Sequence, residues 1–71
     1  MKASNTLRND TMRVSYCGEQ RGVATFRIPS GPANMWFETD AAGNAVSVMP
    51  LIEPYASQAL DMARRILAGD A

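Results

Sequence analysis

The fold of this chain is decided by residues 53–69, whose sequence is EPYASQALDMARRILAG. At about 100° per residue in a helix, the apolar side chains of this stretch fall within one arc about 160° wide. The side chains in this arc are Tyr55, Ala56, Ala59, Leu60, Met62, Ala63, Ile66 and Leu67. Pro54 suits the first helical position, and Gly69 suits the left-handed position just after a helix. The stretch therefore predicts an amphipathic helix whose apolar arc packs on another layer of structure.

Upstream of the predicted helix, apolar and polar residues alternate, which is typical of strands with one buried face. Residues 12–17 and 23–28 are two such runs, and residues 18–22 supply a turn between them. Pairing Val14 with Phe26 places the alternate apolar residues of both runs on one face, as a buried face requires. These residues are therefore expected to form a β-hairpin.

A second hairpin is predicted after a short loop. Residues 29–32, Pro-Ser-Gly-Pro, indicate a loop because two prolines cannot continue a strand ladder. Residues 34–39 and 45–48 then flank residues 40–43, Asp-Ala-Ala-Gly, which suit a type I turn with a glycine bulge.

Together these elements predict a two-layer α+β domain over residues 12–71. Its sheet is expected to have four antiparallel strands in two β-hairpins, with the C-terminal amphipathic helix packed on one face. Residues 1–11 are polar, with Leu7 as the only bulky apolar residue after Met1, and are expected to be a flexible N-terminal arm. An N-terminal helix in place of the arm is the alternative.

Composition narrows the classes of partner. A chain of 71 residues makes one domain, and such a domain buries only about 60% of the surface that its unfolded chain exposes. Lys plus Arg equals Asp plus Glu at seven each, so no overall field attracts nucleic acid or an anionic membrane. With a single cysteine and no apolar run typical of a signal peptide or a membrane span, we expect a cytoplasmic protein without a membrane partner.

The residue types also argue against catalysis and cofactor binding. The chain has no histidine, so Cys17 lacks the usual base for a cysteine nucleophile and is expected to be an ordinary half-buried strand residue. One cysteine without histidine cannot supply the usual zinc, copper or haem ligands, and the glycines occur singly rather than in a phosphate loop. Glu38 and Asp40 share a strand face, which is more often a solvated face than an acid/base pair. We expect no catalytic residue, metal or cofactor, and therefore not an enzyme.

Trp36 and Phe37 are adjacent in a predicted strand, so their side chains point to opposite faces of the sheet. One helix covers only one of those faces. In one register Trp36 lies outside beside Met49, and the inward set is Met35, Phe37, Val46 and Val48. A one-residue bulge reverses the assignment and leaves Met35, Phe37 and Met49 outside. Either register exposes a large apolar side chain with a methionine, which is typical of interfaces. The alternatives are that the arm folds over these side chains or that the strand twists at an edge of the sheet.

Arginines form the second surface feature. The predicted register sets Arg13 directly opposite Arg27 on the outer face, with Arg21 in the turn beyond. Guanidinium groups suit phosphates and carboxylates, although the two arginines could also be solvated or paired with Glu38. The predicted partner-binding residues are Arg13, Arg27, Trp36, Phe37, Glu38 and Met49.

These observations predict a small non-enzymatic protein-binding module of the inhibitor or adaptor type, whose partner is another protein or a second copy of the chain. The alternative is a small nucleic-acid-binding regulator that uses Arg13, Arg27 and the basic arm residues Lys2 and Arg8, a function that zero net charge disfavours. In size and lack of catalytic machinery, though not in any run of residues, the chain resembles short proteins of bacteriophages and mobile elements, including anti-CRISPR proteins. That resemblance implies that the protein acts by covering a surface of its partner.

Overall fold

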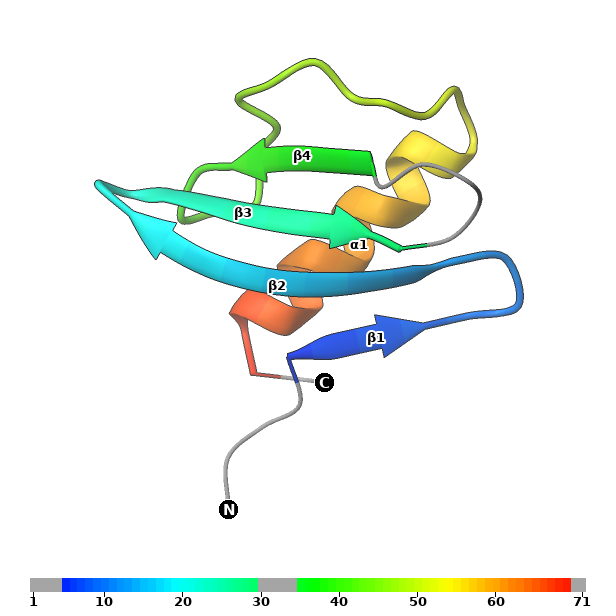
Figure 1. The fold of residues 1–71 in the computed structure, drawn as a ribbon, viewed down its shortest axis with the longest axis horizontal. Coiled ribbons are helices and arrows are strands. Elements are labelled where there is room, and N and C mark those ends of the chain that lie inside the picture. The colour runs from blue at the N-terminus through cyan, green and yellow to red at the C-terminus, as the bar shows by residue number, and fades with distance from the viewer. Residues whose placement is uncertain (1–4, 30–34, 70–71) are drawn as a thin grey trace.

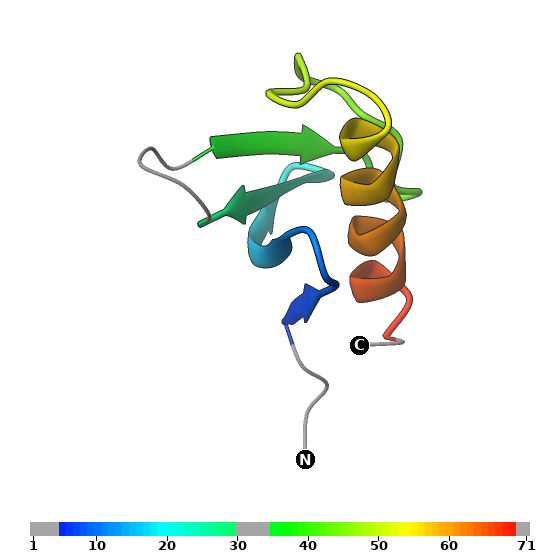
Figure 2. The same ribbon diagram turned by 90° about the vertical axis from the view of Figure 1, so that its right-hand side faces the viewer.

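The computed structural model describes residues 5–29 and 35–69, which form a sheet and one helix in two layers (Figure 1). The strands are β1 (Thr6–Arg8), β2 (Arg13–Gln20), β3 (Val23–Ile28) and β4 (Met35–Thr39), and the helix is α1 (Tyr55–Leu67). All neighbouring strands are antiparallel, in the order β1-β2-β3-β4. Figure 2 shows α1 on one side of the sheet. The predicted fold class is confirmed.

The helix follows its sequence pattern, except that Pro54 is the residue before the helix rather than its first residue. Its buried side chains are Ala56, Ala59, Met62, Ala63 and Ile66, all members of the predicted arc. Tyr55 begins the helix and is 40% exposed, so the arc is less covered at this end. Gly69 has the positive φ (+80°) expected just after a helix, and its N–H donates to the Ile66 carbonyl at 3.0 Å.

The core between the two layers is built around Phe26. Its ring is 5.5 Å from the ring of Tyr16 and stacks on Phe37 at 5.3 Å, both measured between centroids. Val14 and Ile28 are the other large apolar strand side chains that are fully buried. Alanines on α1 face these bulky side chains, which lets the helix approach the sheet. Full burial of each large side chain stabilises the fold by about 1.5–3 kcal/mol.

The first hairpin differs from the predicted one in its turn and register. Gln20 pairs with Val23, so the turn is only Arg21-Gly22, and both residues have positive φ (56° and 80°) as a type I′ turn requires. Tyr16 rather than Val14 is therefore opposite Phe26. Because the shift is by two residues, the same side chains still face the helix.

A β-bulge in β2 accounts for the rest of the difference. The register shifts between Tyr16 and Gly18, which makes Cys17 the extra residue. Cys17 is exposed, not half-buried as expected, because an extra residue at a bulge has no opposite neighbour. Beyond the bulge, Glu19 pairs with Ala24 and lies on the helix side at the end of the sheet.

Part of the expected arm belongs to the sheet. Thr6–Arg8 form β1, and Leu7 packs against the core. The turn into β2 is closed by Asn9, whose side-chain oxygen accepts hydrogen bonds from the N–H groups of Thr11 (2.7 Å) and Met12 (2.8 Å). The Asn-Asp pair at positions 9–10 is a turn signal of known type, while a three-residue strand is too short to show alternation. Residues 1–4 lie outside the described residues.

The predicted fourth strand, residues 45–48, is not a strand. Its one bridge joins Ala45 to Thr39, and Val46 is 51% and Val48 91% exposed. The segment instead follows the edge of β4 briefly: Val46 N–H donates to the Glu38 carbonyl, and Glu38 N–H donates to the hydroxyl of Ser47, both at 2.9 Å. The sheet nevertheless has four strands because β1 adds one at the opposite edge. Of the predicted loop at residues 29–32, only Pro29 is described.

Candidate interaction face

We call the side of the sheet opposite α1 the outer face. Strand side chains alternate between faces, so the observed pairings define its members. They are Thr6, Arg8, Arg13, Ser15, Gln20, Val23, Thr25, Arg27, Trp36 and Glu38. Within the described residues, no helix or strand crosses this face (Figure 2).

Trp36 is the large apolar side chain of the outer face. It is 50% exposed, whereas Phe37 is 1% exposed in the core, so the first of the two predicted registers is correct for this pair. Arg27 is directly opposite Trp36, and its guanidinium carbon lies 5.9 Å from the centre of the tryptophan ring. A cation–π contact at such a site is worth about 0.5–1 kcal/mol. The Nε atom of Arg27 is buried and has no hydrogen-bond partner in the described part of the chain.

Two open hollows on the outer face share Thr25 and Glu38, and Trp36 lines one of them. One is lined by Thr25, Trp36, Phe37, Glu38, Ser47 and Val48, and the other by Gln20, Arg21, Val23, Thr25, Glu38 and Val46. Val46 and Val48 are exposed in the segment that runs beside β4. This end of the outer face therefore combines apolar surface from Trp36 and the valines with polar groups that include the carboxylate of Glu38 and the guanidinium of Arg21.

Arginines occupy the other end of the outer face. Arg8 on β1 is directly opposite Arg13 on β2, and both are exposed. The structure thus replaces the predicted Arg13–Arg27 pair, since Ser15 is the residue opposite Arg27. The sequence alone predicts Arg8 only as a charge on a flexible arm. The turn signal at residues 9–10, between Leu7 and Met12, could have identified it as a strand residue.

The structure gathers some of the predicted partner-binding residues and separates others. Arg13, Arg27, Trp36 and Glu38 all lie on the outer face. Phe37 does not, because its ring stacks on Phe26 in the core. Met49 does not lie beside Trp36 either: it packs against the core, since residues 45–48 leave the sheet edge where a fourth strand had been expected.

Glu38 and Asp40 have different surroundings, since Glu38 lies on the outer face and Asp40 in a turn. Asp40 follows β4 and closes the next turn: its Oδ1 accepts hydrogen bonds from the N–H groups of Ala42 and Asn44, both at 2.9 Å. The bond from Asn44 is the main cause that lowers the pKa of Asp40 below its ordinary value. Among residues 5–29 and 35–69, no three His, Cys, Asp or Glu side chains lie close enough together to hold a metal ion. No helix in the same ranges has the length and apolar character to cross a bilayer.

Comparison of the chain with protein families, curated proteins and solved structures gives no match. The fold and the outer face define the class of protein. It is a small two-layer α+β domain in which α1 covers one face of the sheet and no described helix or strand covers the other. Function therefore has to be argued from the outer face itself, because a fold alone does not specify an activity.

Proposed function

We propose that this protein is a small, non-enzymatic protein-binding module that acts by covering a surface of its partner with the outer face. The observation that carries the proposal is Trp36, a half-exposed tryptophan on a rigid strand, on the side of the sheet opposite α1. Tryptophan and arginine are the residues most enriched in the energetic centres of protein interfaces.

The surroundings of Trp36 support binding through the face of the sheet. Arg27 lies over the tryptophan ring, which restricts both side chains before a partner arrives. Such preorganisation reduces the entropy lost on binding. The N–H and carbonyl of Glu38 are both bonded to residues 46–47, which covers the β4 edge at this point. A partner at this end of the sheet would therefore meet side chains rather than free backbone groups.

In this proposal the mode of action is occlusion, as in inhibitors and adaptors. It needs no chemical step, only a complementary surface with its own apolar pocket for Trp36. The small size of the chain supports a role like that of phage and mobile-element proteins, including anti-CRISPR proteins, in the cytoplasm of the host. The partner is another protein or protein complex, or a second copy of this chain.

Affinity capture from the source cell tests the proposal. Wild type and Ile52→Ala should capture the same partner, whereas Trp36→Ala should lose it, with a weakening of about 2 kcal/mol or more. Ile52 is a matched control because it is 78% exposed but does not line the two hollows that share Thr25 and Glu38. Undiminished capture by Trp36→Ala would contradict the proposal.

Sedimentation velocity over a range of concentrations tests the homodimer version. Self-association that Trp36→Ala abolishes would identify a second copy as the partner. A monomer at every concentration would exclude this version and leave a different protein as the partner.

A nucleic-acid-binding regulator is the second candidate, and the juxtaposition of Arg8 with Arg13 favours it. Lys2, the other basic residue of the expected arm, lies outside the described residues. Titration with short RNA and DNA at two salt concentrations tests this candidate, because binding through phosphates must weaken steeply with salt. No binding at low salt would eliminate it.

A further inference from the structure

We propose that Arg8 and Arg13 together form a binding site for one phosphate group at the basic end of the outer face. This inference does not rest on protein binding through Trp36, since it uses different side chains and a different hollow. It assigns a ligand chemistry to a pair of residues that the fold brings together from the two sides of a turn.

The backbone pairing places the two side chains as close as neighbouring strands allow. Tyr16 N–H donates to the Asn5 carbonyl at 2.8 Å, and Asn9 N–H donates to the Met12 carbonyl at 2.9 Å. Hydrogen-bonded and non-hydrogen-bonded pairs alternate along an antiparallel ladder. Asn9–Met12 is a hydrogen-bonded pair, so the next pair along the ladder, Arg8–Arg13, is a non-hydrogen-bonded pair. Opposite side chains lie closest in pairs of this type.

The turn that joins the two arginines is held by its own hydrogen bonds. The side-chain oxygen of Asn9 accepts from the N–H groups of Thr11 and Met12, in addition to the backbone bond between Asn9 and Met12. The separation of the Arg8 and Arg13 backbones is therefore fixed without any ligand. Only the outer parts of the two side chains have to be ordered when an anion binds.

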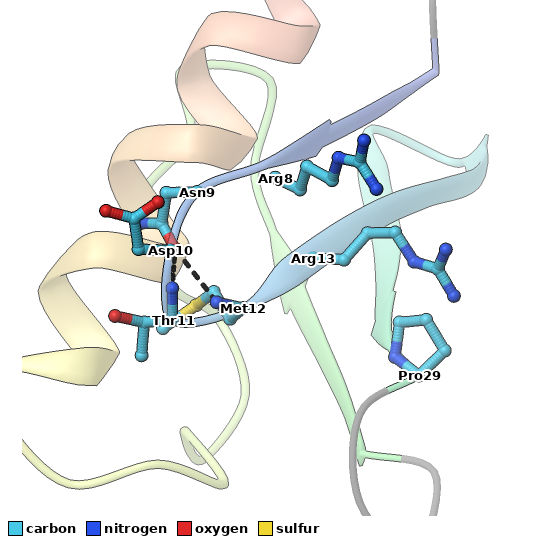
Figure 3. A pocket seen from close by; sticks show the side chains of 7 residues that line it. All are labelled: Arg8, Asn9, Asp10, Thr11, Met12, Arg13 and Pro29. Atoms are coloured by element: carbon cyan, nitrogen blue, oxygen red, sulfur yellow. Dashed lines mark hydrogen bonds between the residues drawn. The ribbon is translucent and has the colours of Figure 1, made fainter.

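Charge at this pair is uncompensated within the described residues, where neither guanidinium makes an ion pair with a carboxylate. Figure 3 shows both arginine side chains extending to the same side of the turn, with the Asp10 carboxylate on the other side. Like charges directly opposite on adjacent strands destabilise a sheet. A bound anion between the two side chains would remove this repulsion.

The two guanidiniums border a hollow whose remaining lining comes from the turn between the two strands, Asp10 included, and from Pro29. It is lined by Arg8, Asn9, Asp10, Thr11, Met12, Arg13 and Pro29 (Figure 3). Two planar guanidinium forks offer more donors than the two oxygens of one carboxylate can use, whereas a phosphate presents three or more oxygens and up to two negative charges. Phosphate is therefore the chemical class that fits. A small phosphorylated molecule and the backbone of a polynucleotide share this chemistry.

An NMR titration of the full chain tests the site and separates the two sources. Arginine Nε–Hε signals are followed with inorganic phosphate, against chloride at equal ionic strength, and separately with a single-stranded oligothymidylate. Saturable shifts at Arg8 and Arg13 with inorganic phosphate would support a small phosphorylated ligand. Saturable shifts with the oligonucleotide alone would support a polynucleotide backbone.

Variants decide whether binding occurs at the proposed residues. Arg8→Gln and Arg13→Gln should each weaken binding by about tenfold, as expected for loss of a charge-assisted contact. For an oligonucleotide, each should also lower the slope of log affinity against log salt by about one. Arg65→Gln is the matched control, because Arg65 is exposed on α1 and the substitution changes net charge equally. The absence of shifts with both probes would overturn the proposal. Affinities of Arg8→Gln and Arg13→Gln within twofold of wild type would also overturn it, as would an equal loss of affinity in Arg65→Gln.

Thermal unfolding gives an independent readout. Whichever probe shifts the arginine signals should raise the melting temperature of wild type and of Arg65→Gln relative to chloride at equal ionic strength, because it binds the folded state in preference to the unfolded state. Arg13→Gln should show no such increase while still unfolding cooperatively. An equal increase in Arg13→Gln would place the anion elsewhere and overturn the assignment.

Discussion

Gly43 shows how a single residue ties a turn to the helix. It is buried with φ at +88°, in the turn that follows β4, and a Cβ added there would overlap the Cγ atom of Arg64 and lie 3.3 Å from its Cβ. The backbone conformation and the contact with α1 therefore both require glycine. Gly22 has a similar φ of +80°, but a Cβ there would meet no atom within 4 Å.

Alanine should be tolerated less well at position 43 than at position 22. Gly43→Ala should lower the free energy of unfolding by about 2–3 kcal/mol, because backbone strain and displacement of Arg64 add. Gly22→Ala should cost only the strain, about 1 kcal/mol. Urea unfolding of both variants measures the difference. Equal losses would mean that the turn moves away from the helix without cost.

At the scale of elements, the turn over residues 40–44 couples stability to pH. The side chain of Asp40 accepts the N–H groups of Ala42 and Asn44 more strongly when it is ionised. These bonds lower its pKa below the ordinary value of 3.8, the bond from Asn44 most of all. A carboxyl whose pKa is lower in the folded state stabilises that state at any pH above its unfolded pKa. This contribution is lost as the pH falls through the lowered pKa.

The corresponding prediction compares wild type with Asp40→Asn, which keeps the acceptor oxygen but cannot ionise. The stability advantage of wild type should be constant above about pH 5 and should shrink as the pH falls below about 4. Thermal unfolding monitored by circular dichroism between about pH 2.5 and pH 7 measures it. Parallel stability curves for the two proteins would show that Asp40 does not contribute to the acid sensitivity.

Elements whose pattern lies within their own residues could be predicted from the sequence. Elements whose position depends on pairing with other segments of the chain could not. The helical pattern of residues 53–69 is complete in itself, including Gly69 at its end. The hairpin register depends on positive φ at Arg21, a conformation that arginine rarely adopts and that composition does not reveal. Residues 45–48 have the composition of a strand, yet the chain leaves the sheet there on its way to α1.

The same distinction applies to the candidate site. Opposite orientation of Trp36 and Phe37 follows from strand geometry alone, so the sequence could predict that one of them would be exposed. Placing Arg8 beside Arg13 requires β1, for which the sequence offers only the turn signal at residues 9–10, because a strand of three residues carries too little alternation. The phosphate site therefore emerged only from the structure, whereas the tryptophan was already a candidate.

At the scale of the whole molecule, the two-layer arrangement buries one of two adjacent residues, Phe37, and exposes the other, Trp36. Phe37 stacks on Phe26 beneath α1 and is 1% exposed, while Trp36 is 50% exposed on the outer face. A domain of this size has a free energy of unfolding of only about 4–10 kcal/mol, so the loss of one core ring removes a large part of it.

Phe37→Ala should therefore lower the free energy of unfolding by about 3–5 kcal/mol, as expected for a large buried side chain. Trp36→Ala should lower it by about 1 kcal/mol or less, chiefly through loss of the contact with Arg27. Urea unfolding of the two variants, followed by circular dichroism, measures both values. The far-ultraviolet circular-dichroism spectrum of folded Trp36→Ala should remain that of wild type. If Trp36→Ala were as destabilising as Phe37→Ala, Trp36 would be a structural residue, and a loss of partner binding in that variant would no longer point to the outer face. A small loss of stability together with a large loss of binding is the combination that an interface residue requires.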